Sequence, residues 1–189
     1  DRGFSSGDCL VGIAAGGTTP YVRGGLHYAQ SVGALSIAMA CVPAKQAPLP
    51  CDLDIRLLTG PELLTGSTRL KAGTATKMAL NILSTGVMVR LGKVYGNRMV
   101  DVSASNSKLV DRSLRILQDL AGVKRSEGLQ LLTAADGSVK TALLMTAADL
   151  SADQAKNLLQ QHDQQLRPAL LALGADLSEL SQPSTAGPQ

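Results

Sequence analysis

Residues 9–20 read Cys-Leu-Val-Gly-Ile-Ala-Ala-Gly-Gly-Thr-Thr-Pro. The apolar first half of this stretch is typical of a strand that is buried on both faces of a parallel sheet. Thr19 before Pro20 predicts a helix start, with the threonine at the N-cap and the proline at the first helical position. A second apolar run, residues 35–41, follows that helix, so the three elements predict a strand–helix–strand unit with parallel strands.

The rest of the sequence predicts one more strand and then helices. Alternation of apolar and polar residues over 53–58 indicates a strand nearer the edge of the sheet. A long helix is expected from about Ser67 to Leu91, and its apolar stripe predicts a place in the core. From Asn106 onward the apolar periodicity is helical only. We therefore expect an α/β fold, a parallel sheet followed by a helical C-terminal region.

The chain is expected to divide into four segments. Residues 1–105 hold the sheet and the long core helix, and residues 106–150 form a small helical subdomain. Residues 151–180 form a C-terminal helix that Pro168 kinks or divides. Residues 181–189 are rich in Ser, Pro and Gln and predict a disordered tail.

Composition argues against several classes of function. The 189 residues include 18 Lys plus Arg and 15 Asp plus Glu, and a net charge of +3 is too mild to indicate a nucleic acid or a membrane surface as partner. Aromatic residues make up only 2%, so no platform for stacking bases is expected. The three cysteines lack C-x-x-C spacing and the two histidines lie far apart, so we expect no metal site built from these side chains.

The first candidate binding loop is Gly16-Gly17-Thr18-Thr19. It follows the first predicted strand, and ligands of open α/β sheets bind at the carboxyl ends of the strands. Its backbone N–H groups and two hydroxyls at a helix start suit a phosphate or sugar hydroxyls. The alternative is a loop that only turns the chain and caps the helix.

The second candidate loop contains Ser67, Thr68 and Arg69. Its hydroxyls precede two cations, Arg69 and Lys71, which are unfavourable in the first turn of a helix unless an anion binds there. Two such loops at one sheet edge favour a phosphorylated sugar over a nucleotide, because the sequence has no GxxxxGK[ST] and no GxGxxG. Again the alternative is a plain N-cap with solvated basic side chains.

A catalytic group is harder to find. Glu62 lies at the same predicted edge and is a weak candidate, because the sequence shows no second carboxylate to pair with it. An ordinary acidic residue at a helix start is the alternative. Neither histidine lies in a motif with an exposed Ser or Cys, so no nucleophile–base pair is predicted.

Three stretches resemble motifs of the N-acetylmuramic acid 6-phosphate etherases. They are VGIAAGGTTPYV at 11–22, GPELLTGSTRLKAGTA at 60–75 and LGKVYGNRMVDV at 91–102, and the similarity covers about residues 8–120. The helical pair that follows, to about residue 149, also fits. One departure is plain, since the family usually has Ser-Gly-Arg-Thr where this chain has Gly16 to Thr19.

This resemblance implies a sheet of the sugar isomerase (SIS) type, related to the glucokinase regulatory protein. Family members are cytoplasmic lyases of cell-wall recycling that use no metal or cofactor. They cleave the D-lactyl ether of N-acetylmuramic acid 6-phosphate to give N-acetylglucosamine 6-phosphate and D-lactate. The implied chemistry removes the C2 proton, eliminates lactate and adds water, with two glutamates as acid and base.

In the family, the phosphate loop and both glutamates precede the strand that begins here at Cys9. We therefore expect this chain to be a C-terminal portion whose sheet lacks its first strands, and to be inactive alone. The apolar surface left open predicts a homodimer or a larger assembly. Two alternatives stay open: a non-catalytic, sugar-phosphate-binding regulatory protein of the same fold, and an aldose–ketose isomerase, for which no motif is present.

Overall fold

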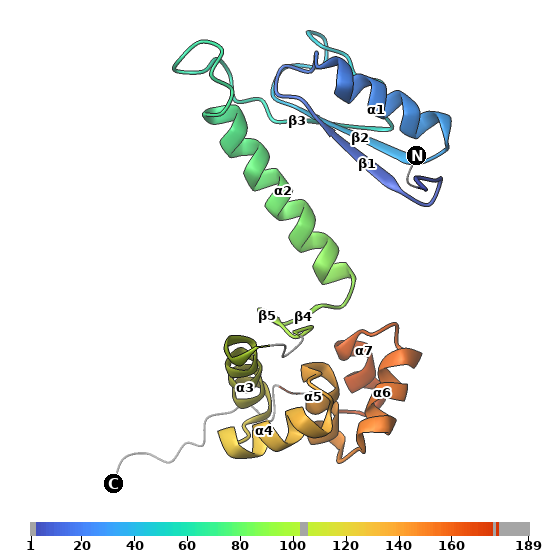
Figure 1. Ribbon diagram of the computed structural model, residues 1–189, viewed down its shortest axis with the longest axis vertical. Helices are drawn as coiled ribbons and strands as arrows, with labels where there is room; N and C mark the ends of the chain where they lie inside the picture. Colours follow the sequence, from blue (N-terminus) through green and yellow to red (C-terminus); the bar gives the residue numbers. More distant parts are fainter. Residues whose placement is uncertain (1–2, 103–105, 176, 178–189) are drawn as a thin grey trace. The chain divides into compact units, whose positions relative to one another are not determined.

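The computed structural model describes residues 3–102, 106–175 and 177 (Figure 1). The chain forms two compact units, residues 1–84 and residues 85–189. Each unit is described by itself.

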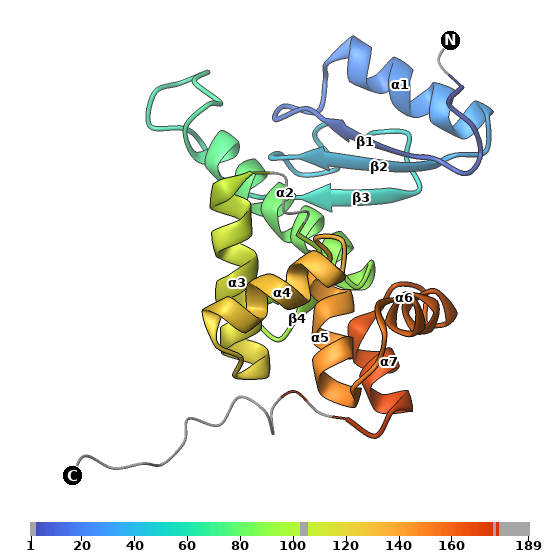
Figure 2. The ribbon, with the colours of Figure 1, turned by 60° about the horizontal axis from the view of Figure 1, so that its bottom comes forward.

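The first unit is built on a parallel sheet of three strands in the order β1-β2-β3. The strands are β1 (Cys9–Ile13), β2 (Leu35–Ala40) and β3 (Leu53–Arg56). Helix α1 (Pro20–Ser31) connects β1 to β2 and runs along one face of the sheet, with β2 between the other two strands (Figure 2). The predicted strand–helix–strand unit and the α/β fold are confirmed.

Close packing of α1 on β1 explains a glycine in the middle of that strand. Leu26 and Ala29 are the buried residues of α1. A Cβ added at Gly12 would lie 3.0 Å from side-chain atoms of Leu26 and Val22, so a larger residue would push the helix away from the strand. The opposite face of the sheet keeps apolar side chains in partial contact with solvent, including Leu53 at 52% exposure.

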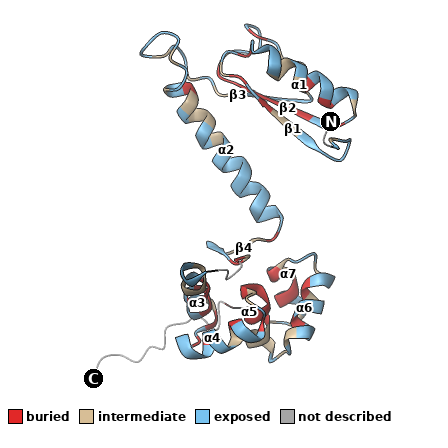
Figure 3. Cartoon of the chain, in the orientation of Figure 1, coloured by how far each residue is buried: buried red, intermediate tan, exposed pale blue. Residues whose placement is uncertain are grey.

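Helix α2 (Lys71–Arg90) crosses the boundary between the two units. It begins four residues after the predicted Ser67, and the cause is described with the site below. Ala72 is its buried residue, whereas Met78 and Ile82 are exposed. Most of α2 is exposed (Figure 3), so its apolar stripe does not lie in a core of this chain as predicted.

The second unit begins with a hairpin and continues as a helical bundle. The hairpin pairs β4 (Val94–Tyr95) with β5 (Arg98–Met99), and the sequence analysis did not predict it. The helices are α3 (Ser107–Ala121), α4 (Arg125–Ala134), α5 (Val139–Ala148), α6 (Ala152–Gln161) and α7 (Leu166–Ala172). Their buried side chains form one apolar core that includes Leu114, Leu117, Leu143, Leu144, Leu159 and Leu170.

The prediction of a helical region from Asn106 onward is confirmed for the described residues. Asn106 caps α3 through a hydrogen bond from the N–H of Leu109, and Gly122 ends the helix in a left-handed conformation. The C-terminal segment that Pro168 was expected to kink or divide is divided into α6 and α7, and the break precedes Pro168, which lies in the first turn of α7. The predicted tail, residues 181–189, lies outside the described residues. No helix among those described is both long and apolar enough to span a lipid bilayer.

Candidate functional site

The first candidate loop is anchored to the carboxyl ends of β1 and β2. The N–H of Ala14 donates to the carbonyl of Met39 at 3.0 Å, and the N–H of Cys41 donates to the carbonyl of Ala15 at 2.8 Å. Gly17 has φ +71°, and a Cβ added there would lie 2.8 Å from the Cβ of Ala47. Only glycine fits this position, because both the backbone conformation and the space exclude a side chain.

Thr18 and Thr19 keep their hydroxyls free within the described part of the chain. Thr19 is the N-cap residue of α1, as predicted, but its side chain makes no capping hydrogen bond. Both threonines are exposed. The loop therefore presents two unengaged hydroxyls and a helix start at the edge of the sheet, which is what binding of an oxygen-rich ligand needs.

Arg56 holds the neighbouring segment, residues 42–47, in place. Its guanidinium donates to the carbonyls of Val42 at 3.1 Å and Ala47 at 3.0 Å, and it pairs with Asp54 at 2.6 Å. The Arg56 side chain is only 11% exposed. A buried guanidinium that satisfies two carbonyls fixes the segment against which Gly17 packs.

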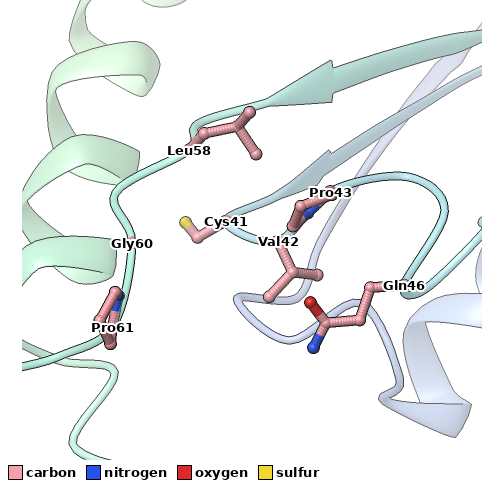
Figure 4. Close-up of a pocket in the computed structure, with 7 residues that line it drawn as sticks. All are labelled: Cys41, Val42, Pro43, Gln46, Leu58, Gly60 and Pro61. Atoms are coloured by element: carbon pink, nitrogen blue, oxygen red, sulfur yellow. The ribbon is translucent and has the colours of Figure 1, made fainter.

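A cavity of about 410 Å³ opens at this edge (Figure 4). Its lining is mostly apolar and consists of Cys41, Val42, Pro43, Gln46, Leu58, Gly60 and Pro61. The Sγ of Cys41 lies 3.7 Å from Oγ1 of Thr76 on α2. Sequence reasoning missed this cavity, because apolar and proline residues after a strand carry no signal that distinguishes a binding wall from a loop.

Glu62 supplies the anion at the N-terminus of α2. Its two carboxylate oxygens accept hydrogen bonds from the N–H groups of Lys71 and Ala72, each at 2.9 Å. The hydrogen bond from Ala72, and then that from Lys71, hold the pKa of the Glu62 carboxyl below its ordinary value. These bonds fix the first helical residue at Lys71, so the prediction that the helix starts at Ser67 is wrong.

The residues of the second candidate loop form a turn before α2. The N–H of Leu70 donates to the carbonyl of Ser67, and the N–H of Gly73 donates to the carbonyl of Thr68. Ser67 is half-buried, whereas Thr68 and Arg69 are exposed. Their side chains are therefore presented beside the helix start and not on the helix itself.

A second cavity of about 410 Å³ lies beside the second loop, and the end of β1 also lines it. Thr68 of the second loop and Ala15, directly before the first loop, both line it. The rest of its wall is Ile13, Ala72, Gly73, Thr76, Lys77, Leu80 and Asn81. Of the predicted binding residues, Thr68 is the one that the structure places in this wall.

No cluster of three or more His, Cys, Asp or Glu side chains suited to a metal ion is found within residues 3–102, 106–175 and 177. Among these residues, the polar groups at the sheet edge include hydroxyls, backbone N–H groups, the amides of Gln46 and Asn81, and the cations of Arg69 and Lys77.

Similarity to known proteins agrees with this arrangement. Over 179 residues, 95% of this chain, the sequence is 80% identical to an N-acetylmuramic acid 6-phosphate etherase of Synechococcus sp. (strain CC9902) and covers 57% of that protein. The etherase of Synechococcus sp. (strain CC9605) is 79% identical over the same share of both chains, and that of Crocosphaera subtropica is 61% identical over 90% of this chain and 56% of its own length. The chain is a close homologue of the N-acetylmuramic acid 6-phosphate etherases. The resemblance predicted from the three motifs is confirmed.

Part of the second unit also matches a second protein family. Residues 96–136 match the family described as the C-terminal lid domain of glucokinase regulatory protein. The matched residues include the turn of the β4–β5 hairpin and the whole of α3 and α4. The chain thus spans a little over half the length of the etherases it matches and contains the helical region related to the regulatory protein.

Proposed function

We propose that this chain supplies the sugar-phosphate-binding part of a cytoplasmic N-acetylmuramic acid 6-phosphate etherase. The observation that carries the proposal is 80% identity over 95% of the chain to a protein of that name. The whole enzyme would cleave the D-lactyl ether of N-acetylmuramic acid 6-phosphate and release N-acetylglucosamine 6-phosphate and D-lactate.

The geometry of the sheet edge supports a phosphorylated amino sugar as ligand. Thr18 and Thr19 offer hydroxyls that no described residue engages, and Thr68 lines the adjoining cavity. Arg69 is exposed next to it and adds a cation with a planar set of donors. In this proposal these groups bind the phosphorylated sugar together with the phosphate loop that the family resemblance places before the strand at Cys9.

The acid and base of the reaction are proposed to come from outside these 189 residues. The chain has three glutamates, Glu62, Glu127 and Glu179. Glu62 is engaged by two backbone N–H groups, and Glu127 belongs to α4 of the second unit. A carboxylate whose pKa is held low and whose oxygens cap a helix is poorly suited to take up a proton near neutral pH.

A chimaeric enzyme tests the proposal. Residues 9–175 of this chain would replace the matching part of the Synechococcus sp. (strain CC9902) etherase, with Arg69→Ala in the same chimaera as the matched control. We expect the chimaera to release D-lactate from N-acetylmuramic acid 6-phosphate, the control to do so with a raised KM, and the purified 189-residue chain to release none. Lactate from the 189-residue chain above a buffer blank would show that the proton carriers are within it. A folded chimaera that neither binds nor cleaves the substrate would overturn the proposal.

The alternative is a non-catalytic regulatory protein that binds sugar phosphates. The match of residues 96–136 to the lid domain of glucokinase regulatory protein is the observation that favours it. The same chimaera separates the two, because tight binding of N-acetylglucosamine 6-phosphate without any lactate release favours the regulatory protein.

We further propose that the protein forms a homodimer. Large apolar side chains are exposed on the sheet and on α2, among them Leu35 at 44%, Leu53 at 52% and Ile82 at 72%. Exposed apolar area of this kind is typical of an interface. Light scattering at micromolar concentration should give twice the chain mass of 19.6 kDa, and a stable monomer would contradict the proposal.

A further inference from the structure

The second unit has a cavity of about 400 Å³ between its hairpin and α3. Its wall combines three arginines with one aspartate, one amide and two apolar side chains: Arg98, Arg112, Arg115, Asp119, Asn97, Met99 and Ile116. None of these residues belongs to the loops at the sheet edge. All seven residues belong to the second unit.

The positive charges of the arginines in this wall are only partly neutralised by ion pairs with carboxylates. Arg98 pairs with Asp119 at 2.7 Å, and Arg115 pairs with Asp111, outside the wall, at 2.8 Å. Asp111 also holds Arg125, so one carboxylate serves two guanidinium groups. Arg112 makes no hydrogen bond or ion pair with any residue that the structure describes. The wall thus carries two more positive than negative side chains, and one of its cations is free.

The spacing along α3 explains how these groups meet. Arg112, Arg115 and Asp119 are three and four residues apart, which places them on one side of the helix. Ile116, only 4% exposed, and Met99 on β5 give the cavity an apolar floor. Arg98 reaches the same space from β5. Guanidinium groups three residues apart repel each other, and an anion between them would turn that repulsion into attraction.

We propose that this cavity binds a small molecule through a phosphate group. Planar guanidinium donors match the oxygens of a phosphate and can bind it in a bidentate manner, which favours arginine at such sites. Arg112 and Arg115 contact the phosphate oxygens, Asn97 adds an amide donor, and the apolar floor receives the uncharged part of the ligand. Asp119 opposes the anion and competes with it for Arg98.

The proposal is tested on the full chain with inorganic phosphate as the probe, by calorimetric titration and by amide chemical shifts. Arg112→Gln removes the free cation without breaking an ion pair, and we expect at least tenfold weaker binding, from the range for hydrogen bonds to charged groups. Asp119→Asn removes the opposing charge and should strengthen binding severalfold. Lys156→Gln is the matched control, because it removes an exposed cation from α6 of the same unit and should change the affinity less than twofold.

The opposite signs for Arg112→Gln and Asp119→Asn distinguish a binding site from a structural ion-pair cluster. Amide shifts in β5 and α3 upon phosphate addition would support the proposal. Shifts confined to Gly16 through Thr19 would overturn it and leave the sugar-phosphate site at the sheet edge untouched. Equal losses for Arg112→Gln and Lys156→Gln would also overturn it, since they would indicate only a general attraction of phosphate to a basic surface.

Discussion

Asp101 holds two lysines in the second unit, and replacing it with asparagine should destabilise that unit strongly. Its carboxylate pairs with Lys93 and, at 3.1 Å, with Lys140, whose side chain is only 6% exposed. Lys140 also donates to the carbonyl of Gln164 at 2.9 Å. Asp101→Asn leaves the ammonium group of Lys140 buried with that carbonyl and an uncharged amide as its partners.

The loss of stability expected for Asp101→Asn lies between the losses measured when buried and exposed ion pairs are broken. Removing one partner of a fully buried pair costs about 3–5 kcal/mol, and exposed pairs contribute about 0–1 kcal/mol. Because the Asp101 side chain is 31% exposed, we expect the free energy of unfolding to fall by about 2–3 kcal/mol. With urea, the midpoint followed by circular dichroism should move down by about 1 M or more.

Two further variants test whether the buried ammonium group of Lys140 causes the loss of stability in Asp101→Asn. Asp111→Asn is the same chemical change at a carboxylate whose partners, Arg115 and Arg125, are 73% and 56% exposed, so its effect should be several times smaller. Asp101→Asn combined with Lys140→Met removes both charges of this pair, including the buried ammonium group, and should be more stable than Asp101→Asn alone. Equal midpoint shifts for Asp101→Asn and Asp111→Asn would refute the reasoning.

The same carboxylate predicts a pH dependence. Burial raises the pKa of the Asp101 carboxyl, but hydrogen bonds from Lys93 and Lys140, and their charges, outweigh it, so the pKa lies below its ordinary value. A carboxyl with a lowered pKa stabilises the fold at pH values above its unfolded pKa of about 4. This stabilisation is lost as the pH falls through the lower folded pKa. Asp101→Asn should therefore flatten the loss of stability below about pH 4.

Three other predictions concern the first unit. Arg69→Ala should weaken binding of a 6-phosphorylated amino sugar to the complete enzyme by about 1.5–3 kcal/mol, and Lys71→Ala by less than half as much, in calorimetric titration; equal losses would mean that the loop is a plain turn. Glu62→Gln should lower the urea midpoint of the chain and raise amide exchange in the first turn of α2, because the carboxylate caps Lys71 and Ala72, and unchanged exchange would contradict this. Arg56→Met should cost about 2–3 kcal/mol in urea unfolding, since it leaves two carbonyls unsatisfied; a variant as stable as the wild type would show that the 42–47 segment does not depend on this arginine.

The fold could be predicted where local signals agreed. Thr19-Pro20 marked the start of α1, and the apolar runs on either side of that helix marked β1 and β2. The helical periodicity began at Asn106, which caps α3, and Gly122 ends that helix; both ends rest on local signals, a capping side chain and a left-handed glycine. The Gly96-Asn97 pair between β4 and β5 is also a hairpin signal, and it was missed because the two strands are only two residues long.

The parts that could not be predicted depend on contacts between distant residues. Glu62 sets the start of α2 from nine residues away, so no pattern in the helix itself could reveal it. Arg56 donates hydrogen bonds to Val42 and Ala47, and residues of the segment between them line the cavity. Sequence reasoning could choose the loops of the candidate site, but the walls of the site arise from tertiary packing.

The position of Glu62 changes which groups remain for a phosphate at the second loop. The N–H groups of Lys71 and Ala72, the most favourable anion-binding donors of α2, are already engaged by its carboxylate. The Nζ of Lys71 lies 3.9 Å from the position that a Cβ on Gly60 would take, so this cation is directed toward the segment that carries Glu62. A phosphate bound at this loop must then depend on the side chains of Thr68 and Arg69. Because such binding comes from one exposed cation and not from the helix, it should weaken with added salt, and it should weaken in Arg69→Ala even though α2 stays intact.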